Sequence, residues 1–207
     1  MKPKIIVILG QTATGKSDLA VKIAKKTNGE IISADSRQVY KGLDIGTGKV
    51  TKREMEGIFH YLIDVASPKK QFTVAEYKEL AEEKIEEIIS RSKTPIICGG
   101  TGFYIDAITK GIVFPGVLPN HSLRRKLALV SDRMLMLKLK KLDPVRAKDI
   151  DPKNKVRLIR AIEIAKSGKN SEYRIMNGEF RDEYKILKIG LKLPNEELKE
   201  RIRARLL

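Results

Sequence analysis

Residues 10–17 stand out in the sequence because their types and spacing suit the binding of a phosphate chain. They match the pattern G-x-x-x-x-G-K-S/T at every fixed position, between an apolar run at residues 4–9 and an amphipathic stretch at residues 16–27. Glycine lets the backbone turn so that successive N–H groups face phosphate oxygens, and a helix N-terminus adds its positive dipole end. In this pattern Lys16 neutralises phosphate charge and Ser17 binds Mg²⁺. The motif predicts a diphosphate or triphosphate ligand but does not define the reaction. The predicted phosphate-binding residues are Gly10, Gln11, Thr12, Ala13, Thr14, Gly15, Lys16 and Ser17.

A second polar cluster follows the next apolar run, at residues 30–34. Asp35 stands directly after that run, and Ser36, Arg37 and Gln38 follow it. At the carboxyl edge of a parallel sheet, where ligands bind, a carboxylate can take a proton, bind a metal ion or cap a turn. From position alone, a catalytic and a capping role for Asp35 are equally supported. Arg37 and Gln38 add a charge and an amide that could recognise an anion or the edge of a base.

A glycine-rich turn at residues 99–102 follows a third apolar run, at residues 95–98. Its glycines indicate either a close approach of the backbone to a ligand or an ordinary flexible turn, and both interpretations stay open. Thr101 supplies the only hydroxyl group of this turn. Cys98 fits a small core residue better than a nucleophile, because no histidine stands near it in the sequence.

Asp64 and His60 are weaker candidates for chemistry. Asp64 ends an apolar run, as a metal-binding aspartate of nucleotide hydrolases does, but a turn-forming aspartate is commoner at such a place. His60 has no carboxylate or second histidine at ligand spacing, so we expect a polar residue at the start of a strand rather than a metal ligand.

The middle of the chain is strongly basic. Its cationic residues are Arg124, Arg125, Lys126, Lys138, Lys140, Lys141, Lys153, Lys155, Arg157 and Arg160. Most of the lysines suit a solvated helix surface, whereas the arginines suit contact with phosphate groups or RNA at least as well. Arg157 and Arg160 stand three residues apart, which places them on one face of a helix.

Alternating strands and helices must position these residues. Up to about residue 110, β-branched runs alternate with amphipathic stretches, which is typical of βαβ units in a parallel sheet. Thr73 and Glu76 form a capping box that predicts the start of a helix. The expected strands are residues 4–9, 30–34, 61–65, 95–98 and 184–193, and the expected helices are residues 16–27, 73–91, 103–109, 123–142, 154–166 and 196–207. The fold class is therefore α/β, with a parallel sheet flanked by helices.

Composition limits the class of protein. The 207 residues contain 42% hydrophobic residues, enough for a sizeable core, and 42 Lys and Arg against 26 Asp and Glu give a net charge of +16, which favours an acidic partner. A single cysteine excludes a disulfide framework and indicates a reducing compartment. The longest apolar run near the N-terminus has five residues, so we expect neither export nor a membrane span but a cytoplasmic protein, acting as a monomer.

Five ordered blocks of the chain resemble the tRNA dimethylallyltransferase family, also called tRNA isopentenylpyrophosphate transferases. The blocks are residues 10–17, residues 32–40 with 44–49, residues 60–64, residues 99–104, and Asn154 with residues 157–163. The resemblance implies a P-loop NTPase-like sheet and transfer of a dimethylallyl group from its pyrophosphate to N6 of the adenosine 3′ of the anticodon, in tRNAs that read codons beginning with U.

The resemblance also implies roles for individual residues. Asp35 would be the general base, Thr101 would act at the catalytic site, and Ser17 would hold Mg²⁺ beside the diphosphate. The residues expected to contact the tRNA anticodon stem-loop are Asp35, Ser36, Arg37, Gln38, Thr101, Arg124, Val156, Arg157, Leu158, Ile159 and Arg160. Gln11 departs from the family, where proline is usual at this position.

The expected domains are a catalytic core of residues 1–112 and about 143–207, and a reduced, basic helical insertion of about residues 113–142 that contacts tRNA. The family's C-terminal residues beyond Leu207 are absent from the sequence, so we expect a short or truncated member. Two alternatives share the phosphate-binding loop. A small-molecule or nucleotide kinase would transfer a phosphoryl group with Asp35 or Asp64 on the metal. An adenylate isopentenyltransferase would use a free nucleotide, but the net charge favours tRNA over a nucleotide.

Overall fold

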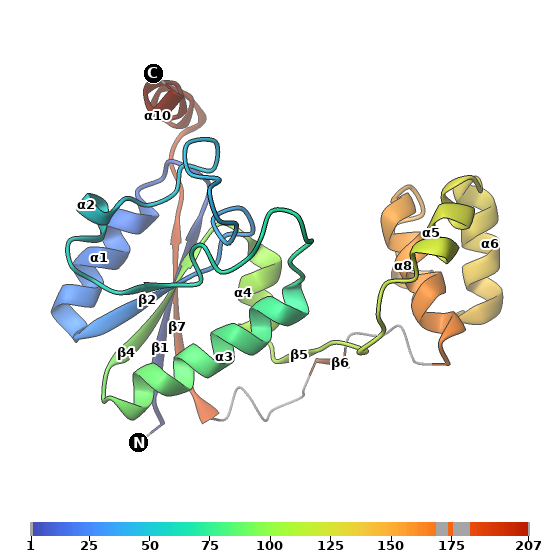
Figure 1. The fold of residues 1–207 in the computed structure, drawn as a ribbon, viewed down its shortest axis with the longest axis horizontal. Coiled ribbons are helices and arrows are strands. Elements are labelled where there is room, and N and C mark those ends of the chain that lie inside the picture. Colours follow the sequence, from blue (N-terminus) through green and yellow to red (C-terminus); the bar gives the residue numbers. More distant parts are fainter. Residues whose placement is uncertain (1, 169–173, 176–182, 207) are drawn as a thin grey trace. The chain divides into compact units, whose positions relative to one another are not determined.

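The computed structural model describes residues 2–168, 174–175 and 183–206. Its main sheet has five parallel strands in the order β3-β2-β4-β1-β7 (Figure 1). The strands are β1 (Lys4–Gly10), β2 (Gly29–Ser33), β3 (His60–Tyr61), β4 (Thr94–Gly99) and β7 (Lys185–Leu191). Because β4 lies between β1 and β2, the carboxyl ends of these three strands are adjacent. The three polar segments predicted to carry the site follow those ends.

Alternation along β1 divides the apolar side chains between the two faces of the sheet. Ile5 and Val7 belong to one core cluster, together with residues of α3 (Val74–Ser90) and α4 (Gly102–Thr109). Ile6 and Ile8 belong to a second cluster, together with Ala20, Val21 and Ala24 of α1 (Lys16–Thr27). Helices therefore cover both faces, as Figure 1 shows, and the α/β fold class is confirmed.

The helix ends follow local chemistry. Gly15 precedes α1 with φ of 82°, a left-handed conformation that favours glycine, and Asn28 ends the helix with φ of 49°. The predicted capping box at α3 is present, since the Thr73 side chain accepts from Glu76 N and the Glu76 side chain accepts from Thr73 N. The short α2 (Lys52–Met55) begins with a second capping box, formed by Thr51 and Glu54.

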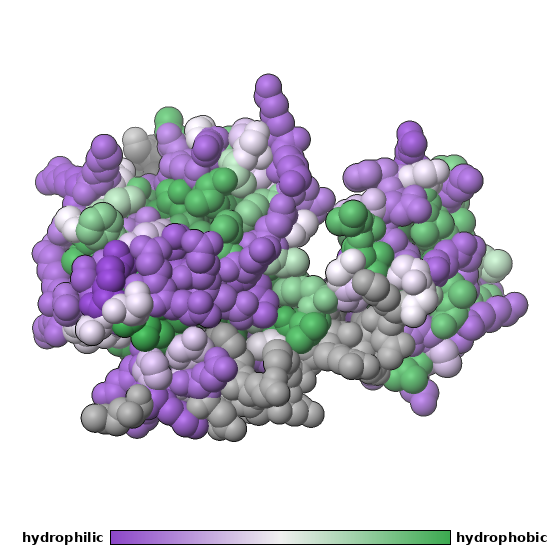
Figure 2. All heavy atoms as spheres, turned by 60° about the horizontal axis from the view of Figure 1, so that its bottom comes forward, coloured by the Kyte–Doolittle hydropathy of each residue, from purple (hydrophilic) through white to green (hydrophobic). Residues whose placement is uncertain are grey.

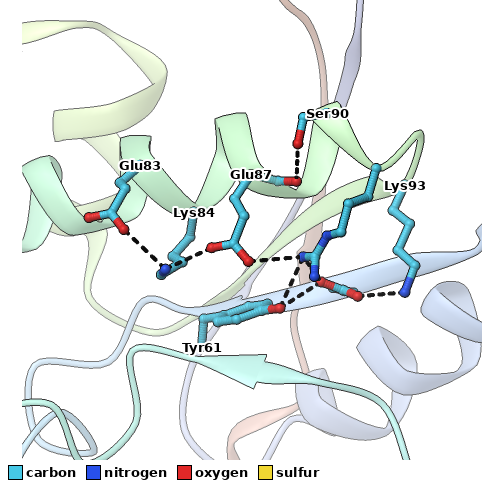
Figure 3. Close-up of polar contacts among 8 residues, drawn as sticks. Tyr61, Glu83, Lys84, Glu87, Ser90 and Lys93 are labelled. Atoms are coloured by element: carbon cyan, nitrogen blue, oxygen red, sulfur yellow. Dashed lines mark hydrogen bonds and ion pairs between the residues drawn. The ribbon is translucent and has the colours of Figure 1, made fainter.

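A buried carboxylate joins β2 and β3 to the end of α3. Glu30 is 2% exposed and accepts hydrogen bonds from Tyr61 Oη at 2.8 Å, Arg91 Nη2 at 2.6 Å and Lys93 Nζ at 2.6 Å. Figure 3 shows how this cluster continues along α3 through Glu87 to Lys84. Burial alone would raise the pKa of Glu30, but the hydrogen bonds from Lys93 and Tyr61 and the charge of Arg91 lower it. The two-residue strand β3 is thereby held against β2.

Residues 113–175 form a second unit, and residues 1–112 and 176–207 form the first. The helices of the second unit are α5 (His121–Ala128), α6 (Asp132–Leu142), α7 (Arg146–Asp149) and α8 (Lys155–Lys166). Leu127, Leu135, Leu139, Leu158 and Ile162 form its core. This unit extends beyond the expected end of the insertion at residue 142, because α8 packs against α5 and α6, and it ends at Ile175. A separate two-stranded sheet joins β5 (Ile112–Val113) to β6 (Arg174–Ile175).

Two further expectations differ from the structure. The single helix predicted at residues 123–142 is two helices, because the Ser131 side chain accepts from Met134 N and begins a new helix there. The strand predicted at residues 61–65 is only His60–Tyr61, since Leu62 and Asp64 adopt φ of 61° and 57°, which breaks an extended chain. The last helix, α10 (Asn195–Leu206), forms close to its expected place.

The surface agrees with the composition. Hydrophilic side chains cover much of the face drawn in Figure 2, with smaller hydrophobic patches between them. Among the described residues, no helix combines the length and the apolar character that a membrane crossing requires.

Candidate functional site

A cavity of about 360 Å³ opens at the carboxyl edge of the main sheet. The phosphate-binding loop contributes Thr12, Ala13, Gly15, Lys16 and Ser17 to its lining. The segment after β2 contributes Asp35 and Gln38, and β4 contributes Cys98 and Gly99. The phosphate-binding loop and the segment after β2 therefore line one cavity. The end of β4, from which the glycine-rich turn begins, lies beside them.

The phosphate-binding loop has the expected backbone conformation. Ala13 and Gly15 adopt left-handed φ angles of 64° and 82°, and α1 begins at Lys16. Within the loop, Thr14 Oγ1 donates to the Gln11 carbonyl oxygen at 2.8 Å, and Lys16 Nζ donates to the same oxygen. The Lys16 ammonium therefore lies over the loop, where a bound phosphate would also meet it.

Gly10 is required by a contact that the motif does not reveal. A Cβ on Gly10 would lie 2.4 Å from the Leu191 carbonyl oxygen at the end of β7. The first glycine of the loop thus permits β7 to pair with β1 as far as Gly10, where its register partner is Leu191.

Asp35 caps a turn and also lines the cavity. Its Oδ1 accepts from Arg37 N at 2.8 Å and from Gln38 N at 3.3 Å, which caps the turn after β2. Among the described residues, none donates a hydrogen bond to Oδ2. The carboxylate is half-buried and lines the cavity. One oxygen therefore fixes the turn while the group remains at the cavity wall.

Thr101 joins the ends of β2 and β4. Its Oγ1 accepts from Ser36 N at 3.0 Å and donates to Ser36 Oγ at 3.3 Å, and its backbone N–H donates to the Ala34 carbonyl oxygen at 3.1 Å. A Cβ on Gly99 would lie only 2.1 Å from that same Ala34 oxygen. The glycine-rich turn thus allows the two backbones to approach closely, and Thr101 holds the turn that begins at Asp35.

His60 and Cys98 also line the cavity. His60 starts β3, as expected, and its Nδ1 lies 2.9 Å from the Ile58 carbonyl oxygen, while its buried Nε2 has no partner among the described residues. Burial lowers the pKa of His60, so its ring is neutral at pH 7. Burial raises the pKa of Cys98 to about 12, which agrees with a core residue and not a nucleophile.

Asp64 is part of an ion pair rather than of a carboxylate cluster. Its Oδ1 lies 2.5 Å from Lys49 Nζ, and its backbone adopts φ of 57° in a turn. No three His, Cys, Asp or Glu side chains within residues 2–168, 174–175 and 183–206 converge as metal ligands. Ser17, at the start of α1 on the cavity wall, fits a Mg²⁺ ion shared with diphosphate oxygens, because Mg²⁺ retains waters and needs few protein ligands.

The predicted tRNA-binding residues of the helical unit separate into two groups. Val156 and Arg157 are exposed on α8, and Leu158 is buried in the core of the unit. Arg124 and Arg160 are bonded to the buried carboxylate of Glu163, with Arg124 Nη2 2.8 Å from Oε2. Arg124 thereby joins α5 to α8, whereas Arg160 lies on α8 with Glu163 and donates to the Val117 carbonyl oxygen. Ile159 is partly buried against the core of the unit.

Arg201 was not found by sequence reasoning. It lines the cavity from α10, and its Nη1 lies 3.9 Å from the place that a Cβ on Gly15 would occupy. No local motif marks it, because its nearness depends on the pairing of β7 with β1, which brings the C-terminal helix to the phosphate-binding loop.

Comparisons with known proteins find relatives in one family. The IPP transferase family model matches residues 38–207. A tRNA dimethylallyltransferase of Halothermothrix orenii is 44% identical over 97% of this chain and 63% of its own length, and one of Bacillus pumilus is 43% identical over 99% and 66%. The chain thus spans about two thirds of these relatives or slightly less.

Solved structures that resemble this chain are of the same kind of enzyme. A full-length tRNA isopentenylpyrophosphate transferase of Bacillus halodurans matches with a TM-score of 0.66 and 38% identity, over 99% of this chain and 65% of that one. A eukaryotic dimethylallyltransferase, described as acting on tRNA, matches with a TM-score of 0.80 and 29% identity, over 99% of this chain and 53% of that one.

Proposed function

Because the chain belongs to the IPP transferase family, we propose that it transfers a dimethylallyl group from dimethylallyl pyrophosphate to N6 of the adenosine 3′ of the anticodon in tRNA. The acceptor tRNAs would be those that read codons beginning with U. The observation that carries the proposal is that the phosphate-binding loop and the Asp35 carboxylate line one cavity. This alkyl transfer requires a binding site for the diphosphate leaving group and a group that accepts a proton.

The chemistry assigns a separate task to each segment. The phosphate-binding loop and Lys16 would bind the diphosphate as the carbon–oxygen bond breaks and the leaving group takes the electron pair. N6 of adenine forms the new bond to carbon and loses one proton, which the Asp35 carboxylate would accept. Gln38, which also lines the cavity, would hold the edge of the base.

Ser17 would be the protein ligand of Mg²⁺. Its place at the start of α1 supports this assignment, because the hydroxyl group and the loop N–H groups then share one phosphate chain. When bound, Mg²⁺ would neutralise negative charge on the diphosphate.

The helical unit would contact the anticodon stem-loop through exposed side chains such as Arg157. Leu158 can contribute only packing of that unit. Arg124 and Arg160 would present their remaining donors to phosphate groups while Glu163 holds them in place. Monomeric state and cytoplasmic location stay predictions.

The test measures transfer of labelled dimethylallyl to an unmodified anticodon stem-loop, in parallel with ATP hydrolysis. We expect label in the RNA and no ATP turnover. Asp35→Asn should lower the transfer rate by roughly 10²- to 10⁴-fold, because the amide cannot take a proton but its oxygen can still cap the turn.

The matched control is Glu79→Gln, an exposed residue of α3 outside the cavity, which should leave the rate unchanged. Pyrophosphate affinity should be the same in Asp35→Asn and wild type. ATP turnover without labelled RNA would instead support a kinase, and equal loss of transfer in both variants would contradict the role of Asp35.

A further inference from the structure

A lysine with a largely buried side chain holds the loop that forms one wall of the cavity. The Lys49 side chain is 7% exposed. Its Nζ donates to Tyr40 O at 2.9 Å, to Asp44 Oδ1 at 2.6 Å and to Asp64 Oδ1 at 2.5 Å. An ammonium group has three protons, so all three are used, and lysine is rarely buried without such partners.

The three acceptors come from three different segments. Tyr40 follows the turn after β2, Asp44 belongs to the loop itself, and Asp64 follows β3. Burial alone would lower the pKa of Lys49, but the hydrogen bonds to Asp44 and Asp64 raise it, so the ammonium remains charged. Val39 and Leu62, beside Tyr40 and Asp64, already share a core cluster, whereas no described residue of the loop belongs to one. The cation therefore joins the loop to two segments that are packed together.

The loop at residues 41–50 has little other support. Ile45 is 98% exposed and Leu43 is 43% exposed, so neither apolar side chain anchors the loop in a core. A Cβ on Gly42 or Gly46 would meet nothing within 4 Å. The loop is held mainly by polar contacts, made by Lys41 N with Ala66 O, by Gly48 O with Gln38 Nε2, and by the Lys49 ammonium group.

The loop is nevertheless part of the site. Thr47 and Val50 line the cavity. Gln38 Nε2 donates to Gly48 O at 3.3 Å, and Gln38 O accepts from Asp64 N at 3.2 Å. The Gln38 side chain, which would hold the acceptor base, is thus bonded to the residue before Lys49, and the Gln38 backbone is bonded to the residue that pairs with Lys49.

We propose that Lys49 is a positioning residue, whose ammonium group holds residues 41–50 as a cavity wall and so places Gln38 and Thr47 for the acceptor base. This inference rests on the proposed function. Lys49 would touch neither substrate, because its donors are all directed to Tyr40, Asp44 and Asp64. The three acceptors of the ammonium group lie outside residues 10–17, so diphosphate binding should not depend on it.

The first experiment compares hydrogen exchange of the full chain in wild type, Lys49→Met and Lys41→Met. Lys41 is an exposed residue of the same loop, so its variant removes the same charge without removing the cross-link. The amides of Gly48 and Lys49, which donate to Ile45 O and Asp44 O, should exchange at least about tenfold faster in Lys49→Met only. Residues 10–17 should be unaffected.

The second experiment measures transfer kinetics. Lys49→Met should lower kcat/KM for the stem-loop by about 10- to 100-fold, while KM for dimethylallyl pyrophosphate and the salt dependence of RNA binding stay at wild-type values. A residue that bound RNA phosphate would instead reduce that salt dependence. Lys41→Met should keep wild-type kinetics.

Chemical rescue distinguishes the loss of the ammonium group from a general effect of the substitution on the fold. Lys49→Cys treated with 2-bromoethylamine regains an ammonium group at almost the original length, and Cys98 should resist the reagent because it is buried with a raised pKa. Rescue of both exchange and kcat/KM supports the proposal. Unchanged loop exchange in Lys49→Met overturns it, as does altered exchange with unchanged kcat/KM. If the wild type transferred no label, the proposed function would be overturned. Hydrogen exchange of the loop would then still show whether Lys49 holds it in place.

Discussion

Gly99 shows how a single hydrogen atom in place of a side chain determines the arrangement of the site. A Cβ at this residue would lie 2.1 Å from the Ala34 carbonyl oxygen and 2.8 Å from the Ala34 Cα, both backbone atoms of the segment that leads to Asp35. Neither atom can move without shifting β2 or β4. The segment that positions Asp35 therefore depends on this close approach.

We predict that Gly99→Ala lowers the free energy of unfolding by about 1 to 3 kcal/mol or more, because the added methyl group overpacks two strands. Urea-induced unfolding of the full chain measures it. Gly102→Ala is the control, since its Cβ would meet nothing within 4 Å and alanine favours the first turn of α4. If the two variants had the same free energy of unfolding, β2 and β4 could move apart without loss of stability.

At this same scale, the sequence identified the residues whose chemistry is local. The phosphate-binding loop follows from a contiguous motif, and the capping bonds of Asp35 follow from residues two and three positions later. His60 and Arg201 were not assigned to the cavity, because their place in it depends on strand neighbours far apart in the chain. Periodicity predicts that a strand forms but not which strand it pairs with.

At the scale of elements, the helical unit depends on one buried acid. Glu163 is 2% exposed and accepts from Asn120 N, Arg124 and Arg160, which joins the start of α5 to α8. Burial alone would raise its pKa, but the hydrogen bonds from Arg124, Asn120 N and Arg160 lower it to about 2. The family resemblance assigned both arginines to tRNA, and helix periodicity alone could not show that both also bond to Glu163. Ser131, by contrast, is an N-cap type of residue that could have revealed the break between α5 and α6.

The depressed pKa of Glu163 predicts a dependence of stability on acid. Because the folded state holds the carboxylate charged, this contribution is present above the unfolded pKa near 4.5 and is lost as the pH falls toward 2. The loss should be at most about 3 kcal/mol. Hydrogen exchange of the α5 and α8 amides at pH 6 and pH 3 measures it within the unit. In Glu163→Gln these amides should be less protected from exchange at pH 6, and their protection should fall less on acidification. If the variant kept the pH dependence of the wild type, Glu163 would not be its cause.

At the scale of the whole molecule, parallel pairing of β1 with β7 brings the segments that follow these two strands to the cavity. The register runs from Lys4 with Lys185 to Gly10 with Leu191, and the residues that follow are the phosphate-binding loop and the segment leading to α10. Lys16 and Arg201 thus line one cavity although 185 positions separate them in the sequence. Sequence patterns predicted both elements, but the cavity itself exists only once the sheet has formed.

This arrangement predicts that pyrophosphate stabilises the chain through residues of both segments. At a ligand concentration 100 times the dissociation constant, binding to the folded state alone adds about 2.7 kcal/mol to the free energy of unfolding. Thermal unfolding with and without pyrophosphate measures the gain, and Lys16→Ala and Arg201→Ala should each reduce it, because each removes a cation from the cavity wall. Arg203→Ala, an exposed residue of the same helix outside the cavity lining, should retain the wild-type gain. If Arg201→Ala also retained it, α10 would lie beside the diphosphate site without contributing to it, and the phosphate-binding loop would be sufficient for binding.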